Sequence, residues 1–278
     1  MLIRSTWTLT VAEPTTLPQS YRLELVKELH RRMSLDIGGE AVPSVVYSGI
    51  MGYCTTSRDF LTFDPNEFYQ LSLCGLQETA SKAIASLTFE SSNPDLPPTL
   101  ELLGAKFNII NRDDEITSYE NLYHTLVAVE PEPEKRFDLR FTTPTAFSQN
   151  RIYLPLPLPS LMFRSWLERW NHFAPVYLGS DELVHYLSES IAVSRHNIQT
   201  RSFPVHSGRV TGFVGTVTLQ ILSLPDPLLA NVANLLIHYA QFAGTGMKTR
   251  LGMGQTLVKR ENYTFNQKAD DINQVRQL

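Results

Sequence analysis

The segment DPLLANVANLLIHYAQFAGTGMKTRLGMGQ, residues 226–255, decides the predicted fold. Asp226 is a typical N-cap residue, and Pro227 suits the first helical position. Apolar residues then recur at helical spacing until Gly244 begins a glycine-rich stretch, after which residues 255–263 have the pattern of a terminal strand. The segment therefore predicts a helix, a glycine loop and a strand, in that order. The predicted apolar face of the helix consists of Leu228, Val232, Leu235, Leu236, Tyr239 and Phe242.

The glycine loop has features that suit a phosphate-bearing ligand. Glycine lets backbone N–H groups approach a ligand closely, and Lys248 and Arg250 add two cations. Met247 stands where a Walker loop needs glycine, and Thr249 stands where the dinucleotide fingerprint needs its third glycine. In both motifs the loop also follows a strand and precedes a helix, which is the reverse of the order here. The loop is predicted to grip a polymer backbone laid over a sheet; an ordinary glycine-rich turn is the alternative.

The second half of the chain repeats a simple order of elements. A strand alternates Phe137, Leu139 and Phe141, and a helix begins near Ser160. Strands over 193–203 and 208–222 follow, and the helix and strand described above complete β-α-β-β-α-β, a ferredoxin-like unit. The aromatic residues of the first of these helices are predicted to be core because they recur at helical spacing. They are Phe163, Trp166, Trp170 and Phe173.

The first half is compatible with the same unit. A strand over 3–11 precedes a helix whose apolar stripe runs from Tyr21 to Met33. Strands near 44–51, 68–73 and 100–110 and a helix near 77–86 follow, with an extra helix expected over 118–126. The run EPEPEK, residues 130–135, is a typical extended linker. We therefore expect an α+β protein of two tandem ferredoxin-like (RRM-like) domains, residues 1–130 and 136–265, followed by a polar tail over 266–278.

Composition limits the classes of function. The net charge of −4 and the sequence pI near 6.0 argue against indiscriminate coating of nucleic acid, so any such binding requires local basic patches. Cys54 and Cys74 are the only cysteines and imply no disulfide framework. The N-terminus lacks the pattern of a signal peptide, and no apolar run approaches the ~20 residues of a membrane helix. We expect a soluble, cytoplasmic protein with no membrane partner.

Three stretches of the second half carry a resemblance to a known family. They are residues 244–255, the run LRFTTPTAF over 139–147 with LPLPLP over 154–159, and GFVGTVT over 212–218. The chain resembles the CRISPR-associated repeat-processing endoribonucleases, the Cas-six family of the RAMP superfamily. The resemblance implies metal-independent cleavage of CRISPR repeat RNA to guide RNAs, with no cofactor. It also implies CRISPR effector subunits as partners, and we expect a homodimer as one possible assembly.

The chemistry implied by the resemblance needs proton carriers. The ribose 2′-OH attacks the adjacent phosphorus, so a general base, a general acid and a cation are useful. Of seven histidines, His30 is the leading candidate because it lies near the end of the first helix, where similar family members place a catalytic histidine. The helix C-terminus is expected to raise its pKa, with Arg31 and Arg32 opposing this. The alternative is a histidine that only caps helix carbonyls.

The remaining site residues are predicted from the same resemblance. Tyr47 and Ser48 lie in the strand where the family often contributes a second site residue, although Ser-Pro-Leu of many members is replaced here. Arg31 is expected to neutralise the phosphate. No histidines have metal-ligand spacing, so no metal site is predicted. The expected RNA contacts are Lys27, Arg32, Gly244, Gly246, Lys248, Thr249, Arg250, Gly252, Gly254, Arg195, Arg201 and Arg209. Arg209 lies near a turn at 206–209 that presents a basic hairpin. Ordinary surface charge is the alternative for each cation.

Two other functions stay open at this stage. A non-catalytic RNA-binding subunit of a CRISPR effector complex would have the same fold. A small-molecule enzyme would use the glycine loop for a nucleotide, although the failed motif matches argue against it.

Overall fold

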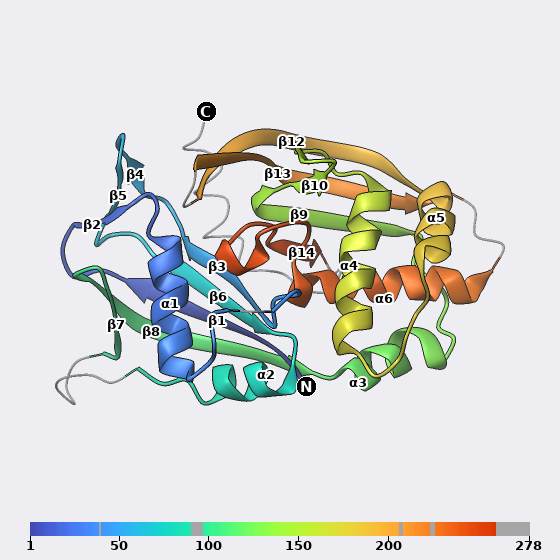
Figure 1. Cartoon of the computed structure of the whole chain (residues 1–278), viewed down its shortest axis with the longest axis horizontal. Helices are drawn as coiled ribbons and strands as arrows, with labels where there is room; N and C mark the ends of the chain where they lie inside the picture. Colours follow the sequence, from blue (N-terminus) through green and yellow to red (C-terminus); the bar gives the residue numbers. More distant parts are fainter. Residues whose placement is uncertain (39, 90–96, 206–207, 223–225, 260–278) are drawn as a thin grey trace.

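The computed structural model describes residues 1–38, 40–89, 97–205, 208–222 and 226–259 of the 278-residue chain. Both halves contain an antiparallel sheet with two ferredoxin-like helices, so the fold is α+β with tandem ferredoxin-like units (Figure 1). The predicted fold class is confirmed. The strand order in each half is that of the β-α-β-β-α-β unit, with the first and third strands central.

The N-terminal sheet has the order β3-β6-β1-β8-β7. Alternation in β1 buries Ile3, Ser5 and Trp7, as predicted. The buried Ser5 hydroxyl is satisfied because it donates to Asp114 Oδ1 at 2.6 Å. The elements of this half are β1 (Leu2–Thr10), β2 (Thr15–Pro18), α1 (Arg22–Met33), β3 (Val45–Met51), β4 (Thr55–Thr56), β5 (Phe60–Phe63), β6 (Tyr69–Gly75), α2 (Glu78–Ala85), β7 (Thr99–Leu102) and β8 (Ala105–Thr117).

The C-terminal sheet has the order β12-β13-β9-β14. Asp226 caps α6 as predicted, since its carboxylate accepts from the Leu228 N–H at 2.9 Å. The elements are α3 (Tyr119–Tyr123), a π-helical turn (His124–Ala128), β9 (Arg136–Thr145), β10 (Phe147–Gln149), β11 (Ile152–Leu154), α4 (Pro159–Phe173), α5 (Asp181–Ser190), β12 (Ile191–Val205), β13 (Gly208–Ile221), α6 (Pro227–Ala243), a 3₁₀ turn η2 (Thr249–Leu251) and β14 (Thr256–Lys259).

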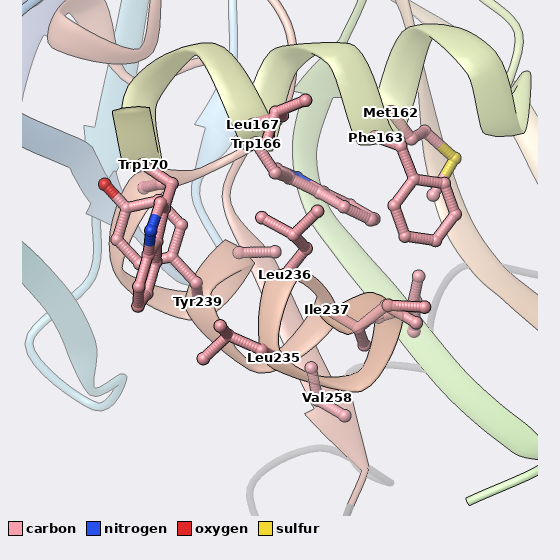
Figure 2. Packing of buried hydrophobic residues seen from close by; sticks show 14 of the residues in the cluster. Met162, Phe163, Trp166, Leu167, Trp170, Leu235, Leu236, Ile237, Tyr239 and Val258 are labelled. Atoms are coloured by element: carbon pink, nitrogen blue, oxygen red, sulfur yellow. The ribbon is translucent and has the colours of Figure 1, made fainter. Parts of the chain in front are cut away.

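The aromatic residues of α4 are core, as the spacing predicted. Trp166 and Trp170 are fully buried against α6, where Figure 2 shows Trp170 beside Tyr239. The Trp166 N–H donates to the Thr245 hydroxyl at 2.9 Å, and the Trp170 N–H donates to the Val176 carbonyl at 2.8 Å. Both indoles therefore have their partners inside the protein, and neither forms a platform for stacked bases.

Three expectations differ from the structure in detail. Leu228 was placed on the apolar face of its helix, but it is 49% exposed and Leu229 packs against the core instead. α5 was not predicted, although Leu183, Val184 and Leu187 are buried at helical spacing. The three-stranded β2-β5-β4 sheet and the β10–β11 hairpin were also missed, because strands of two to four residues give little periodicity.

One apolar cluster spans the boundary between the two halves, while most of the N-terminal core forms a second cluster. Leu76 of the first half packs in the same cluster as the α4 and α6 side chains. The Tyr119 hydroxyl donates to the Leu76 carbonyl at 2.8 Å and lies 3.1 Å from the Tyr239 hydroxyl. The domain boundaries remain a prediction, and the tail at 266–278 lies outside the described residues. Within the described parts of the chain, no helix is long and apolar enough to cross a membrane.

Candidate active site between the two halves

His30 lies in the last turn of α1 and is only 1% exposed. Its Nδ1 is 3.0 Å from the carbonyl oxygen of Asp36. Because a carbonyl only accepts, Nδ1 carries the proton of the neutral ring. The other nitrogen, Nε2, is buried and has no hydrogen-bond partner among the described residues. The neutral ring therefore presents a bare, basic Nε2, the form that a general base requires.

The predicted direction of the His30 pKa is wrong. Burial is the largest cause and lowers the pKa from its ordinary value of 6.5. The bond to Asp36 acts in the opposite direction, and the charge of Arg250 lowers the pKa further. The neutral ring therefore predominates at neutral pH.

Tyr47 lies beside His30 on β3. The two ring centroids are 5.7 Å apart with an interplanar angle of 38°. The Tyr47 hydroxyl is buried without a described hydrogen-bond partner. Burial raises the pKa of Tyr47 well above its ordinary value, so the phenol keeps its proton. Tyr47 is therefore a hydrogen-bond donor with no partner among the described residues, on a ring that packs beside the His30 ring.

Arg250 brings the second half of the chain to this pair. η2 contacts both α1 and β3, and the charge of Arg250 lowers the pKa of both His30 and Tyr47. Its guanidinium donates to the Ile37 carbonyl at 2.8 Å and to Glu40 Oε2 at 3.0 Å. The neighbouring Thr249 hydroxyl is buried and has no described partner. The site is therefore composite, with the imidazole and phenol from one half and the cation from the other.

The other predicted catalytic residues are not brought to this cluster. The Arg31 guanidinium, 69% exposed, pairs with Glu28 at 2.8 Å. The Ser48 hydroxyl donates to the Gly49 carbonyl at 2.6 Å and accepts from the Ser72 N–H at 2.8 Å, so it is satisfied within the sheet. Arg31 and Ser48 therefore have structural partners rather than a free place beside His30. Consecutive residues of a helix point in different directions and those of a strand point to opposite faces, which separates Arg31 from His30 and Ser48 from Tyr47.

Lys27 and Arg32, predicted to contact RNA, also have carboxylate partners. Lys27 pairs with Glu24 at 2.8 Å, and Arg32 pairs with Glu28 at 2.6 Å. These are ordinary ion pairs along one helix, of the kind worth ~0.3–0.5 kcal/mol. Neither contact places a cation beside His30.

The glycine loop packs against the protein itself, in contrast to the prediction that its amides face a ligand. At Gly254, φ is +75° and a Cβ would collide with the Thr245 carbonyl. At Gly252, φ is +98° and a Cβ would lie 2.9 Å from the Ser48 carbonyl of β3. These positions need glycine because the backbone turns left-handed while it touches its own neighbours.

The loop amides are mostly used inside the chain. Met247 donates to the Ala146 carbonyl at 2.9 Å, and Gly254 donates to the Pro144 carbonyl at 3.1 Å. Gly244 and Gly246 likewise donate to Ala240 and to the Ser165 hydroxyl. The loop is therefore closely packed and positions Thr249 and Arg250 at the site, while most of its amides are bonded within the chain.

The predicted contacts outside this cluster are spread over the loop and the β12–β13 hairpin. Lys248 forms no ion pair with any described residue, and Arg195 is exposed on the hairpin, which extends from α5 toward the N-terminal half (Figure 1). The Arg209 guanidinium donates to Ser202 at 2.6 Å and to Gln19 at 3.3 Å. Arg201 lies on the exposed part of β12. Residues 206 and 207 of the predicted turn lie outside the described residues.

No three His, Cys, Asp or Glu side chains among the described residues are arranged to hold a metal ion. The residues that sequence reasoning missed are Asp36 and Glu40, in the loop after α1. A carboxylate and a carbonyl in an irregular loop carry no periodic signal, so only the tertiary structure shows that they bind His30 and Arg250.

Comparison with known proteins shows a similarity over the second half of the chain. A sequence model described as CRISPR-associated endoribonuclease Cas6 matches residues 139–256. The Cas6 endoribonuclease of Streptococcus thermophilus is 29% identical over 124 residues, 44% of this chain and 50% of the relative. That of Mycobacterium tuberculosis is 32% identical over 134 residues, 46% of this chain and 42% of the relative. By its second half the chain is similar in sequence to Cas6 endoribonucleases. A solved Cas6 product complex supports the fold, with a TM-score of 0.69 at 22% identity over 93% of this chain and 100% of that one.

The match to the Cas6 sequence model lies entirely in the second half of the chain. The chain spans about half the length of the curated Cas6 relatives it matches. The matched segment includes Arg250 and the glycine loop, whereas His30 and Tyr47 lie outside it. The roles of these two residues therefore rest on their geometry in this Cas6 fold.

Proposed function

We propose that the protein is a metal-independent endoribonuclease that cleaves CRISPR precursor RNA within its repeats and releases guide RNAs. The observation that carries the proposal is that His30 and Tyr47, whose ring centroids lie 5.7 Å apart, each bury a polar atom with no described partner, within the electrostatic influence of Arg250 from the other half. An imidazole base, a phenol donor and a guanidinium are the three groups that attack by a 2′-OH requires. The similarity of the second half to Cas6 endoribonucleases supports the substrate class.

The reaction uses these residues in sequence. His30 Nε2 takes the proton of the 2′-OH, and the 2′ oxygen forms a bond to the adjacent phosphorus. The bond from phosphorus to the 5′ oxygen breaks, and Tyr47 supplies the proton to that leaving oxygen. Arg250 stabilises the charge that develops on the phosphorane oxygens. The products are a 2′,3′-cyclic phosphate and a 5′-hydroxyl, and the proton held by His30 later returns through solvent to Tyr47.

RNA competes with the loop after α1 for Arg250. The Glu40 carboxylate of that loop accepts from Arg250, whereas the Asp36 carbonyl holds Nδ1 of His30 and leaves Nε2 to act on the substrate. A phosphate would replace the carboxylate as the partner of Arg250, since both are anions that accept from a guanidinium fork. RNA binding and release of Arg250 from Glu40 are therefore coupled in this proposal.

Lys248 and the hairpin residues Arg195, Arg201 and Arg209 are proposed to hold the RNA backbone outside the catalytic cluster. Double-stranded RNA is recognised mainly through phosphates and shape, which suits a projecting basic hairpin. We further propose a cytoplasmic location and an association with CRISPR effector subunits, because the guide RNA would pass to them. A homodimer is tested by measuring the mass of the protein in solution.

The test uses repeat RNA transcribed from the CRISPR array of the source genome. End-labelled RNA is incubated with the protein in excess EDTA, and the cut ends are identified. Site-specific cleavage giving a cyclic phosphate supports the proposal. Cleavage that EDTA abolishes would reject the metal-independent mechanism.

A non-catalytic RNA-binding subunit is the second candidate, and the 1% exposure of His30 is the observation that favours it. The same assay separates the two functions. Tight binding of the repeat RNA without any strand scission over hours would favour the binding subunit.

A further inference from the structure

Arg22, at the start of α1, is a cation that the catalytic proposal does not use. Among the described residues it forms no ion pair and no side-chain hydrogen bond, and its Nε is buried without a partner. This contrasts with Lys27, Arg31 and Arg32 of the same helix, each of which pairs with a glutamate. A guanidinium has five donors, so an unpartnered one at a partly buried position is costly unless a ligand completes it.

Two aromatic rings from opposite halves hold this guanidinium in place. Its central carbon lies 5.0 Å from the centroid of the Tyr21 ring and 4.5 Å from that of the Phe203 ring on β12. The Tyr21 ring is itself fixed, because its hydroxyl accepts from the Ile50 N–H at 2.8 Å. Both contacts lie within the ~6 Å range of cation–π attraction. The guanidinium is therefore held in position before any ligand binds.

The position of Arg22 connects the hairpin with the catalytic cluster. Its neighbour on β3 is Gly49, where a Cβ would lie 3.0 Å from Arg22 Nε, and Gly49 is two residues from Tyr47. Phe203 belongs to the hairpin, whose Arg209 bonds Gln19 just before α1. Arg22 precedes His30 by eight residues of helix, about 12 Å at 1.5 Å per residue, which places it about two turns from the catalytic cluster.

We propose that Arg22 binds an RNA backbone phosphate between the hairpin and the cleavage site, at a nucleotide other than the one that is cut. The inference rests on the proposed function. An oxyanion with two acceptor oxygens matches the planar fork of arginine. The point charge of a lysine would not reproduce that match. The phosphate would be bidentate and flanked by Tyr21 and Phe203.

The experiment measures binding of the repeat RNA described above by fluorescence anisotropy at several salt concentrations, in a His30→Ala background that keeps the RNA intact. Arg22→Gln is expected to weaken binding about tenfold and to reduce the slope of log K against log salt by ~0.7, the value for one phosphate on a single strand. Arg22→Lys keeps the charge and is expected to keep the slope while losing affinity. Arg164→Gln, an exposed arginine of α4 paired with Asp181, is the control and should change neither quantity.

The outcomes separate this inference from the proposed function. If the parent protein neither binds nor cuts the repeat RNA, the proposed function fails. If the parent protein binds and Arg22→Gln binds with the same affinity and salt slope, Arg22 is not a phosphate ligand. A lower melting temperature in Arg22→Gln with an unchanged salt slope would also overturn the proposal, because it identifies the two-ring contact as purely structural. Arg22→Met, which keeps a long apolar stem between the rings, provides the same comparison if Arg22→Gln fails to fold.

Discussion

The Arg250 guanidinium donates to Glu40 Oε2 at 3.0 Å, joining the glycine loop of the second half to the loop that contacts His30. The same carboxylate also accepts from the Ser44 N–H at 3.0 Å. One acidic side chain therefore ties the loop after α1 to the cation of the candidate site. The contact is partly exposed, and a pair of this kind contributes ~1 kcal/mol or less to stability.

Glu40→Gln is expected to bind repeat RNA several-fold more tightly, because the carboxylate that competes with phosphate for Arg250 is removed. The melting temperature should change little. Anisotropy titrations at one salt concentration provide the measurement, with Glu132→Gln in the exposed linker as the charge-matched control. Weaker binding in Glu40→Gln would show that Glu40 supports the RNA site and does not compete with it.

His30→Ala is expected to lower the single-turnover cleavage rate by ~10²–10⁴-fold, the usual cost of losing a general base, while RNA affinity changes little. His185→Ala is the control because His185 is exposed on α5. A cleavage rate that His30→Ala leaves intact would remove the base from the proposed mechanism.

The pH dependence follows from the direction of the His30 pKa shift. A base acts in its neutral form, so the cleavage rate should rise with pH through the His30 pKa and level off by about pH 6.5, because burial lowers that pKa. The measurement is a single-turnover rate profile from pH 4.5 to 8. A rate that still rises steeply above pH 7 would contradict a lowered pKa.

Arg250→Gln should move the same profile in a defined direction. Arg250 lowers the His30 pKa, so its removal is expected to raise the pKa and shift the rising limb to higher pH. The plateau rate should also fall by ~10²-fold or more because the phosphorane loses a cation. Lys248→Gln is the comparison: it should weaken RNA binding without moving the limb. If the cleavage rate of Arg250→Gln rises over the same pH range as that of the parent protein, Arg250 does not affect the His30 pKa.

Gly254→Ala should destabilise the fold by about 2 kcal/mol or more, since alanine at φ +75° is strained and its Cβ meets the Thr245 carbonyl. Gly104→Ala is the matched control, with φ of +82° and no atom within 4 Å of the added Cβ. The difference between the two free energies of unfolding, from urea titrations, measures the close packing of the loop. Equal losses would mean that only backbone strain matters at Gly254.

Much of the fold was predictable because it follows from the short-range spacing of apolar residues and from helix caps. Alternation in β1, helical spacing in α1 and α4 and the Asp226–Pro227 cap predicted those elements, and the order of elements predicted the tandem ferredoxin-like units. His30 and Tyr47 were also named from sequence, through a family resemblance that states where such residues lie. α5 and the small sheets escaped because they are short or weakly periodic.

Sequence alone determined the architecture, since that depends on local spacing and on residue type, and it named His30 as the candidate base through a family resemblance. Tertiary structure decided the chemistry at that imidazole. The contact with the Asp36 carbonyl selects the tautomer, burial lowers the pKa, and Arg250 arrives from 220 positions further along the chain. Desolvation and charge proximity act through space, whereas periodicity acts along the chain, so no pattern around His30 carries either one.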